Sequence, residues 1–242
     1  MIDINKHIIE KNKTVREALI KLNELSSDLS LTLFVINEKS QICGTITDGD
    51  IRRGLVNKLS LEDPIEKFMN NKFHFLKQNN YTIEQLDSIR EKNIKIIPIL
   101  DENNKIIKLF NLEKQKSILP VDGVIMAGGR GKRLSPLTDK TPKPLLPVGD
   151  KPIIQYNIER LIDFGLWNIF VTVNYLGEQI EQWINSKNNY HEIIKIIKET
   201  EPLGTIGSVS LIRDMFIHNT ILIINSDLLT NINYEEFYRN FI

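Results

Sequence analysis

The residues after position 121 alternate short, predominantly apolar runs with amphipathic stretches of helical length. The apolar runs lie at 122–127, 168–173, 193–197 and 220–224. The stretches between them, at 153–164, 177–184 and 208–214, carry apolar residues at helical spacing. Strands that are apolar throughout are buried on both faces, which predicts a parallel sheet covered by helices on each side. We therefore expect a Rossmann-like, doubly wound, mostly parallel α/β sheet that binds ligands outside the carboxyl ends of its strands.

The residues before this segment contain a weak internal repeat of helix, strand, turn, strand and helix. The first copy begins with a helix for which Thr14 is a candidate N-cap, and the second with a helix from Thr82. The expected strands lie at 31–36, 42–47, 94–100 and 105–110. Pro120 favours an extended connector. Two such copies can bury each other's sheet faces, so we expect an α+β domain at 1–118 ahead of the α/β domain at 121–242.

Composition excludes several classes of partner. Lys plus Arg and Asp plus Glu both number 31, and a net charge of zero gives no global field to attract nucleic acid or an acidic membrane. The single cysteine, Cys43, forms no internal disulfide and fits a reducing cytoplasm. We expect no signal peptide, because no apolar core follows a basic start, and no apolar run approaches the roughly 20 residues that span a bilayer. Any phosphate chemistry must therefore come from a local site.

The most informative segment is the glycine-rich loop that follows the first apolar run. Gly128, Gly129 and Gly131 let the backbone approach a ligand closely, and their N–H groups can form an anion-binding concavity. Lys132, Arg133 and Lys143 add positive charge, and together with the glycines they describe a cradle for a triphosphate. The loop matches neither a Walker A loop nor a dinucleotide fingerprint, because glycines required by each are missing. Taken alone, it would also suit a flexible basic surface loop.

The longer pattern resembles a known family. Gly128-Gly-x-Gly-x-Arg-Leu-x-Pro-Leu-Thr, followed by Pro142-Lys-Pro, is similar to the signature of sugar-1-phosphate nucleotidyltransferases. The segments Glu199-Thr-Glu-Pro-Leu-Gly-Thr and Asn225-Ser-Asp agree with that family in order and spacing. The resemblance covers residues 121–242. It implies an enzyme that joins a nucleoside triphosphate to a sugar 1-phosphate and releases pyrophosphate.

The resemblance also implies roles for individual residues. The backbone around Ala127–Gly129 would contact nucleoside and phosphates, Arg133 would hold the β- and γ-phosphates, and Lys143 would neutralise charge at the α-phosphate. Asp227 would ligate Mg²⁺, which takes one or two carboxylates together with phosphate oxygens and water. Such a reaction needs positioning and charge stabilisation rather than a protein nucleophile, and none is evident in the sequence.

Glu199 bears on the choice of base. In this family the segment before Leu-Gly-Thr lies against the base, and the uridylyl and thymidylyl enzymes resemble one another in carrying Gln five residues before the glycine. Counted back from Gly204, that position is Glu199 in this chain. A carboxylate only accepts hydrogen bonds, and guanine presents two adjacent donors. We therefore hypothesise a guanylyltransferase with GTP as substrate, similar to mannose- and heptose-1-phosphate guanylyltransferases. The alternative is that Glu199 is a solvated loop residue and the enzyme is a uridylyl-, cytidylyl- or thymidylyltransferase.

The segment Gly44-Thr-Ile-Thr-Asp-Gly-Asp resembles the end of a CBS module. The resemblance implies that Thr47 and Asp50 bind an adenine nucleotide, although Thr47 or Asp48 would equally serve as a helix N-cap. The second copy lacks both residues. A tandem CBS pair ahead of such a transferase resembles a bacterial type that makes GDP-glucosamine for legionaminic acid, a constituent of cell-surface glycans. CBS pairs often dimerise, so a homo-oligomer is expected.

Two readings of the whole chain compete. The first is an enzyme that forms a nucleotide sugar, and the second is a CBS-regulated nucleotide sensor without catalysis. The family continues for roughly a hundred residues beyond the segment that follows Asp227, and that remainder carries most of the sugar pocket and a second metal-binding aspartate. We therefore expect the chain as given to bind nucleotide and to catalyse poorly or not at all.

Overall fold

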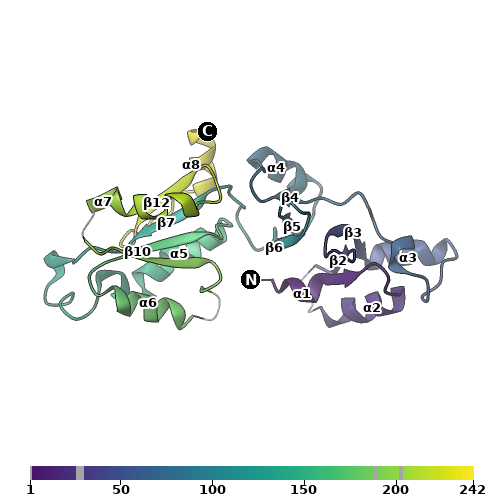
Figure 1. Cartoon of the computed structure of the whole chain (residues 1–242), viewed down its shortest axis with the longest axis horizontal. Helices are drawn as coiled ribbons and strands as arrows, with labels where there is room; N and C mark the ends of the chain where they lie inside the picture. The colour runs from purple at the N-terminus through teal and green to yellow at the C-terminus, as the bar shows by residue number, and fades with distance from the viewer. Residues whose placement is uncertain (1, 26–29, 188–189, 202–203) are drawn as a thin grey trace. The chain divides into compact units, whose positions relative to one another are not determined.

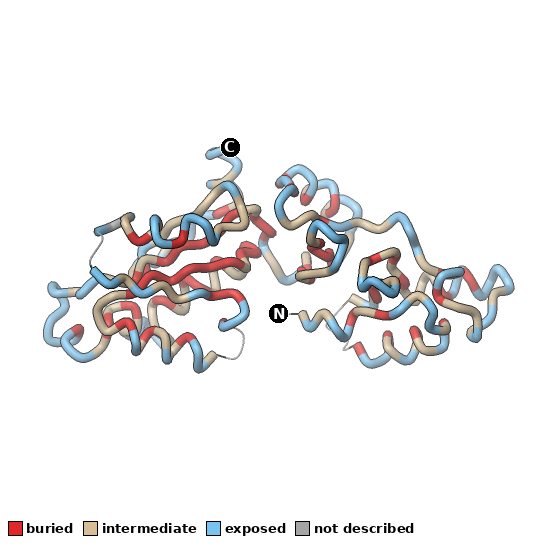
Figure 2. Tube along the Cα trace, in the orientation of Figure 1, coloured by how far each residue is buried: buried red, intermediate tan, exposed pale blue. Residues whose placement is uncertain are grey.

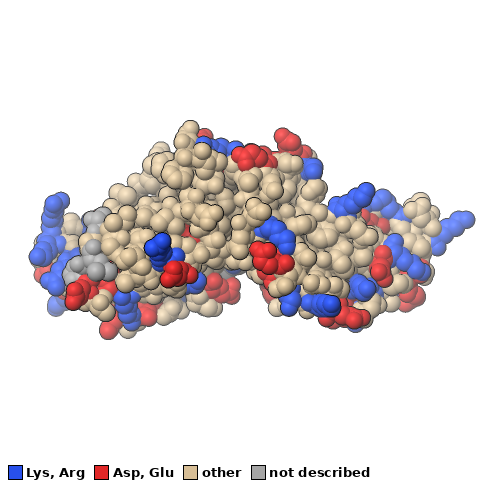
Figure 3. Space-filling view, turned by 45° about the horizontal axis from the view of Figure 1, so that its top comes forward, with Lys and Arg blue, Asp and Glu red and all other residues tan. Residues whose placement is uncertain are grey.

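The computed structural model describes residues 2–25, 30–187, 190–201 and 204–242 (Figure 1). The chain divides into two compact units, Met1–Lys114 and Gln115–Ile242. Charged side chains of both signs are interspersed over the face seen in Figure 3. Within the described residues, none of the helices has the length and apolar character that crossing a membrane requires. Each unit is described by itself below.

The first unit repeats one arrangement of strands. Each copy pairs its first strand in parallel with its second, and its second antiparallel with its third. Both antiparallel pairs carry a register shift at the equivalent point, after Val35 and after Ile99. The elements are α1 (Ile4–His7), β1 (Ile8–Glu10), α2 (Val15–Glu24), β2 (Thr32–Ile36), β3 (Ile42–Thr47), α3 (Asp48–Val56), η1 (Ile65–Lys67), β4 (Leu76–Lys77), α4 (Ile83–Glu91), β5 (Ile96–Leu100) and β6 (Ile106–Asn111).

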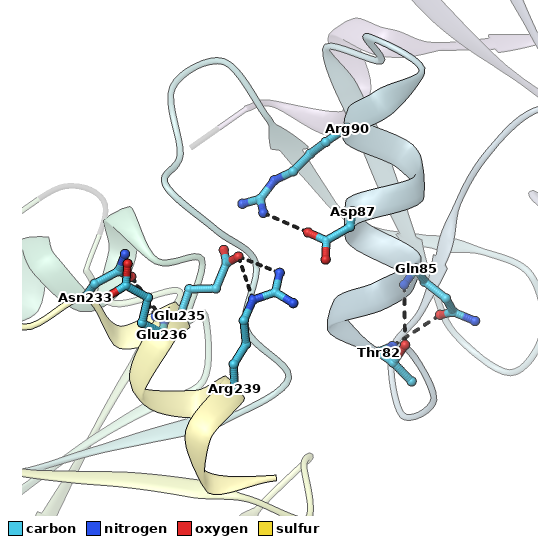
Figure 4. Close-up of polar contacts among 8 residues, drawn as sticks. All are labelled: Thr82, Gln85, Asp87, Arg90, Asn233, Glu235, Glu236 and Arg239. Carbon is cyan, nitrogen blue, oxygen red and sulfur yellow. Dashed lines mark hydrogen bonds and ion pairs between the residues drawn. The ribbon is translucent and has the colours of Figure 1, made fainter.

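The helices of the repeat begin at side-chain caps. Thr14 and Glu17 form a reciprocal capping box at α2, and Thr82 and Gln85 form one at α4 (Figure 4). Each box satisfies two backbone N–H groups that the first helical turn leaves unpaired. The two copies also share a core, in which Phe34 from β2 packs with Ile96 and Leu109 from the second sheet. The expected duplication and mutual burial are therefore confirmed.

The second copy differs from the expected repeat because no helix follows β6. Asn111 occupies the position equivalent to Thr47, and its side chain accepts hydrogen bonds from the N–H groups of Glu113 and Lys114. The apolar residues Ile118 and Leu119, farther along the chain, are buried in the second unit. A closing helix would have required those two side chains for its own apolar face, so the expectation of a complete second copy was wrong.

The second unit contains a four-stranded sheet in the order β11-β10-β7-β12, with all neighbours parallel. Its central strands are the buried segments that cross the unit in Figure 2. The elements are β7 (Asp122–Met126), η2 (Lys132–Leu134), η3 (Lys143–Leu145), β8 (Pro147–Val148), β9 (Lys151–Pro152), α5 (Ile153–Asp163), β10 (Ile169–Val173), α6 (Gly177–Asn185), β11 (Ile194–Lys198), α7 (Gly204–Gly207), η4 (Ser208–Met215), β12 (Ile221–Asn225) and α8 (Tyr234–Phe241).

Helical segments cover both faces of this sheet. A Cβ on Gly123 of β7 would lie 3.2 Å from side chains of Leu161 and Leu166, at the end of α5. The next residue, Val124, packs with Ile212 of η4. Because successive strand residues point to opposite faces, α5 and η4 lie on opposite sides of β7. The predicted doubly wound, mostly parallel fold is confirmed, although residues 208–215 form a 3-10 helix.

Helix α5 ends in a glycine-dependent turn that anchors the start of the second unit. Gly165 has φ +76°, its N–H donates to Ile162 O, and the N–H of Leu166 donates to Leu161 O. This is the Schellman pattern, which pairs the last carbonyls of a helix. The N–H of Leu119 donates to Phe164 O at the same turn. These contacts attach residues 116–119 to the second unit, whereas we had expected the first domain to reach residue 118.

Candidate functional site

A cavity of about 560 Å³ lies at the carboxyl ends of the parallel strands. Met126 at the end of β7, Thr172 near the end of β10 and Asn225 at the end of β12 line it. The strand order reverses between β7 and β12, since β10 and β11 follow on one side of β7 and β12 lies on the other. That reversal is where doubly wound sheets bind ligands. Seven residues singled out from the sequence line this cavity: Gly128, Gly129, Gly131, Lys143, Glu199, Gly204 and Asp227.

The glycine-rich loop continues directly from β7. The N–H of Ala127, which is buried, donates to Thr172 O and fixes the start of the loop on β10. Gly131 has φ +63°, and a Cβ there would lie 3.0 Å from the side chain of Thr138. The hydroxyl of Thr138 donates to Gly131 O at 2.9 Å. Residue 131 thus needs glycine both for its backbone conformation and for the close packing of Thr138.

Lys143 and Asp227 form an ion pair inside the cavity. Lys143 begins η3, and Asp227 follows β12 in the turn that starts at Asn225. That turn is fixed from two sides. The N–H of Ser226 donates to Met126 O, and the buried side-chain amide of Asn157 donates to Ser226 O at 3.1 Å. The sheet and α5 therefore determine where the Asp227 carboxylate lies.

The cavity residues fit a Mg²⁺ ion that shares its ligands with a phosphate-bearing molecule. Asp227 offers one half-buried carboxylate toward the cavity. No group of three or more His, Cys, Asp or Glu side chains that would hold a metal ion exists among the residues with described positions. Mg²⁺ typically binds one or two protein carboxylates and completes its shell with phosphate oxygens and water. Asp227 would therefore hold the ion only together with a ligand.

Glu199 lies beside the glycine-rich loop. Its N–H donates to Val173 O, and the side-chain amide of Asn174 donates to Glu199 O at 3.2 Å. A Cβ on Gly128 would lie 3.3 Å from both a carboxylate oxygen of Glu199 and the Cβ of Asn174. These residues form one wall of the cavity. Pro202 and Leu203, which belong to the same motif, lie outside the described residues.

Two predicted phosphate-binding cations are not among the lining residues. Lys132 and Arg133 lie on η2 and are exposed. Arg130, which we did not single out from the sequence, lines the cavity, and its guanidinium lies over the ring of Tyr175 at 5.6 Å from the centroid. The roles of Lys132 and Arg133 stay predictions. The spacing of the loop gave no signal that distinguishes Arg130 from its basic neighbours.

In the first unit, Thr47 and Asp50 cap helix α3. The N–H of Asp50 donates to the Thr47 hydroxyl oxygen, and the Thr47 N–H and hydroxyl both donate to the Asp50 carboxylate, at 2.9 and 2.6 Å. Arg53 pairs with the other carboxylate oxygen. The N-cap interpretation is thereby confirmed for Thr47. Binding of an adenine nucleotide by this pair stays a prediction.

The sequence analysis also missed polar cavity residues at the strand ends. Thr172 and Ser208 are buried and share a hydrogen bond of 3.3 Å between their hydroxyls. Asn174 directly follows strand β10 and lines the same cavity. Their signal was available in principle, because polar residues that directly follow apolar strands of a parallel sheet lie at its ligand-binding edge.

Residues 122–242 match the nucleotidyl transferase family. The mannose-1-phosphate guanylyltransferase catalytic subunit beta of Xenopus tropicalis is 34% identical over 119 residues, which cover 48% of this chain and 33% of the relative. A mannose-1-phosphate guanyltransferase of Saccharomyces cerevisiae is 37% identical over 117 residues, 47% of this chain and 32% of the relative. The chain thus spans about a third of the length of these curated relatives.

Solved structures resemble each half only in part. HddC from Yersinia pseudotuberculosis, solved as a complex with GMP-PN, overlaps 50% of this chain and 53% of its own at 29% identity and a TM-score of 0.45. A CBS domain protein from Pyrobaculum aerophilum, solved as a complex with AMP, overlaps 44% of this chain and 79% of its own at 14% identity and a TM-score of 0.37.

Proposed function

This chain belongs to the nucleotidyl transferase family through residues 122–242, and on that premise we propose that the protein makes a GDP-sugar and pyrophosphate from GTP and a sugar 1-phosphate. The observation that carries the proposal is the single cavity in which the glycine-rich loop, the Lys143–Asp227 pair and Glu199 meet. We further propose that the product serves cell-surface glycan synthesis in the cytoplasm, as the resemblance of the two-part architecture implies.

The proposed reaction is an in-line transfer. A phosphate oxygen of the sugar 1-phosphate forms a bond to the α-phosphorus of the nucleotide, and the bond from that phosphorus to the bridging oxygen breaks, so that pyrophosphate leaves with the electron pair. The glycine N–H groups orient the phosphates, Lys143 compensates charge at the α-phosphate, and Arg133 holds the leaving group. Mg²⁺ held by Asp227 would supply charge neutralisation at the phosphate oxygens.

The proposed preference for guanine rests on Glu199. Its carboxylate lies within the cavity wall beside Gly128, where a base can approach the loop. A carboxylate accepts two adjacent N–H donors of guanine, and uracil offers no such pair. The names of the curated relatives, mannose-1-phosphate guanylyltransferases, support the same choice.

Calorimetry tests the proposal. We expect GTP with Mg²⁺ to bind this chain more tightly than UTP, CTP, dTTP or ATP, and Arg133→Ala to weaken that binding. Glu199→Gln should remove the preference for GTP. Glu201→Gln is the matched control, because Glu201 is an exposed carboxylate two residues away that does not line the cavity. A preference for GTP that survives in Glu199→Gln would refute the assignment of the base.

The same titration separates the enzyme from the alternative of a regulatory sensor. Binding of ATP or AMP alone, abolished by Asp50→Ala and unaffected by Arg133→Ala, would place the working site in the first unit. A preference for UTP, CTP or dTTP would indicate the other transferases of the family. Release of pyrophosphate from GTP across a panel of sugar 1-phosphates would identify the sugar.

A further inference from the structure

Tyr175 links the turn after β10 to the far end of the glycine-rich loop. Its hydroxyl donates to Asp139 O at 3.0 Å. The guanidinium of Arg130, on the near side of the loop, lies over its ring at 5.6 Å from the centroid. One side chain thus contacts the loop at both ends of residues 130–139. A neighbour on α6, Gln179, donates to Lys140 O at 3.0 Å and extends the same attachment.

The backbone around Tyr175 is itself constrained. Leu176 has φ +51°, a conformation that residues other than glycine rarely adopt. Gly177 is buried, and a Cβ there would lie 2.8 Å from the side chain of Val173. The N–H of Gly177 donates to Asn174 O and closes the turn. Because the turn is tight and packed on the strand, the direction in which Tyr175 leaves the backbone is fixed by the sheet.

The loop that Tyr175 contacts also carries hydrogen bonds within itself, among them those from the Ser135 hydroxyl to the Asp139 carboxylate. Residues 132–137 are exposed, and Thr138 is the buried residue that fixes the loop internally, through its hydroxyl bond to Gly131 O. Without an external attachment, the cations of such a loop would have to be ordered when a phosphate binds, at a cost in affinity. Tyr175 and Gln179 supply that attachment from the rigid edge of the sheet.

We propose that Tyr175 is a positioning residue, which orders the glycine-rich loop and holds Arg130 at the cavity for the β- and γ-phosphates of the nucleotide. The proposal rests on the proposed function, since it assigns the loop to a triphosphate. The proposal predicts different effects of Tyr175 on two parts of the nucleotide. The base and the α-phosphate bind at Glu199 and Lys143, which Tyr175 does not contact, whereas the outer phosphates depend on the loop.

The test compares GTP and GMP binding by calorimetry, each with Mg²⁺, in the intact chain. Tyr175→Leu removes the ring and the hydroxyl, and should weaken GTP binding by roughly three- to tenfold, as loss of one hydrogen bond and one cation–π contact implies. GMP binding should not change. Tyr175→Phe keeps the ring under Arg130 but loses the hydroxyl, so its affinity for GTP should lie between those of the wild type and Tyr175→Leu.

Tyr156 provides a matched control. Its hydroxyl also donates to a backbone oxygen, Val148 O at 2.7 Å, and it also carries a cation over its ring, with Lys151 at 4.4 Å from the centroid. It does not line the cavity. Tyr156→Phe should leave both affinities unchanged. An equal loss of affinity for GTP and GMP in Tyr175→Leu, or no loss of affinity for either nucleotide, would overturn the proposal.

Hydrogen exchange of the ligand-free chain tests whether Tyr175 orders the loop, and this test does not depend on the proposed enzyme activity. Amides of residues 130–140 should exchange faster in Tyr175→Leu than in the wild type or in Tyr156→Phe, while β7 and β10 stay protected. Unchanged exchange in the loop would refute the positioning role. If the wild type bound neither nucleotide, the proposed function would fail, and loop exchange alone would then decide whether Tyr175 orders the loop.

Discussion

Replacing Gly165 by alanine should destabilise the second unit strongly. The added Cβ would lie 2.5 Å from Ser117 O and 2.6 Å from the Cα of Ile118. Both are backbone atoms, and they belong to the segment that hydrogen bonds to the end of α5, so neither can rotate away. Residue 165 also has φ +76°, which alanine adopts at a cost. The steric overlap and the positive φ both contribute to the loss of stability.

The positive φ costs alanine about 1–2 kcal/mol, and overpacking against immobile neighbours adds about 1–3 kcal/mol. We expect a loss of about 2–5 kcal/mol in the free energy of unfolding. Gly204→Ala separates the two contributions. Gly204 has φ +78°, nearly the same conformation, but a Cβ there would meet no atom within 4 Å. That variant should lose only the conformational part, about 1–2 kcal/mol.

Tryptophan fluorescence during urea denaturation measures the effect in the correct unit. Both tryptophans of the chain, Trp167 and Trp183, lie in the second unit, so their signal does not report on the first. Equal losses of unfolding free energy in Gly165→Ala and Gly204→Ala would refute the steric reasoning, because the close backbone contacts at residue 165 would then have no effect on stability. A loss confined to Gly165→Ala would refute the conformational part instead.

Three further variants test other parts of the molecule. Burial lowers the pKa of His7 below 6.5, so the unfolded chain binds a proton at this residue at higher pH than the folded chain does. The first unit should therefore lose stability as the pH falls below about 6.5, and it should lose less in His7→Asn. Urea titrations followed by circular dichroism measure this, with His191→Asn, at an exposed histidine, as the control that should behave as wild type. Asp122→Asn should lower the free energy of unfolding of the second unit by about 2–4 kcal/mol, because the buried carboxylate accepts four hydrogen bonds. A decrease of less than about 1 kcal/mol in the fluorescence assay would contradict this. Replacing Mg²⁺ by EDTA should weaken GTP binding to the wild type but not to Asp227→Asn, as calorimetry can show.

The sequence predicted most elements of the second unit well, because its short apolar runs alternate with amphipathic stretches of helical length. The helix from Ile153 was expected to stop at Gly165, and it does so through the glycine turn. Helix α8 (Tyr234–Phe241) was not predicted, although Asn233 caps it by accepting from the N–H groups of Glu235 and Glu236 (Figure 4). The short strands β1 and β4 were also missed, because three- and two-residue strands carry no readable periodicity.

The candidate site was predictable to the extent that its residues lie in linear motifs. Gly128, Lys143 and Asp227 belong to such motifs, and they line one cavity. Asn157 and Tyr175 do not, since they act through backbone carbonyls of segments distant in the sequence. A hydrogen bond to a carbonyl requires no particular residue at the accepting position, so nothing in the sequence marks that position.

In the ligand-free cavity the positive charge of Lys143 and the negative charge of Asp227 offset each other, because the two side chains form an ion pair. A ligand that carries only negative charge, such as inorganic phosphate, attracts Lys143 but leaves the aspartate without its counter-charge. A phosphate that arrives with a divalent cation exchanges both partners at once, lysine to phosphate and aspartate to cation. Discrimination between bare and metal-bound phosphates is therefore built into the resting arrangement of two side chains, before any contact with the base.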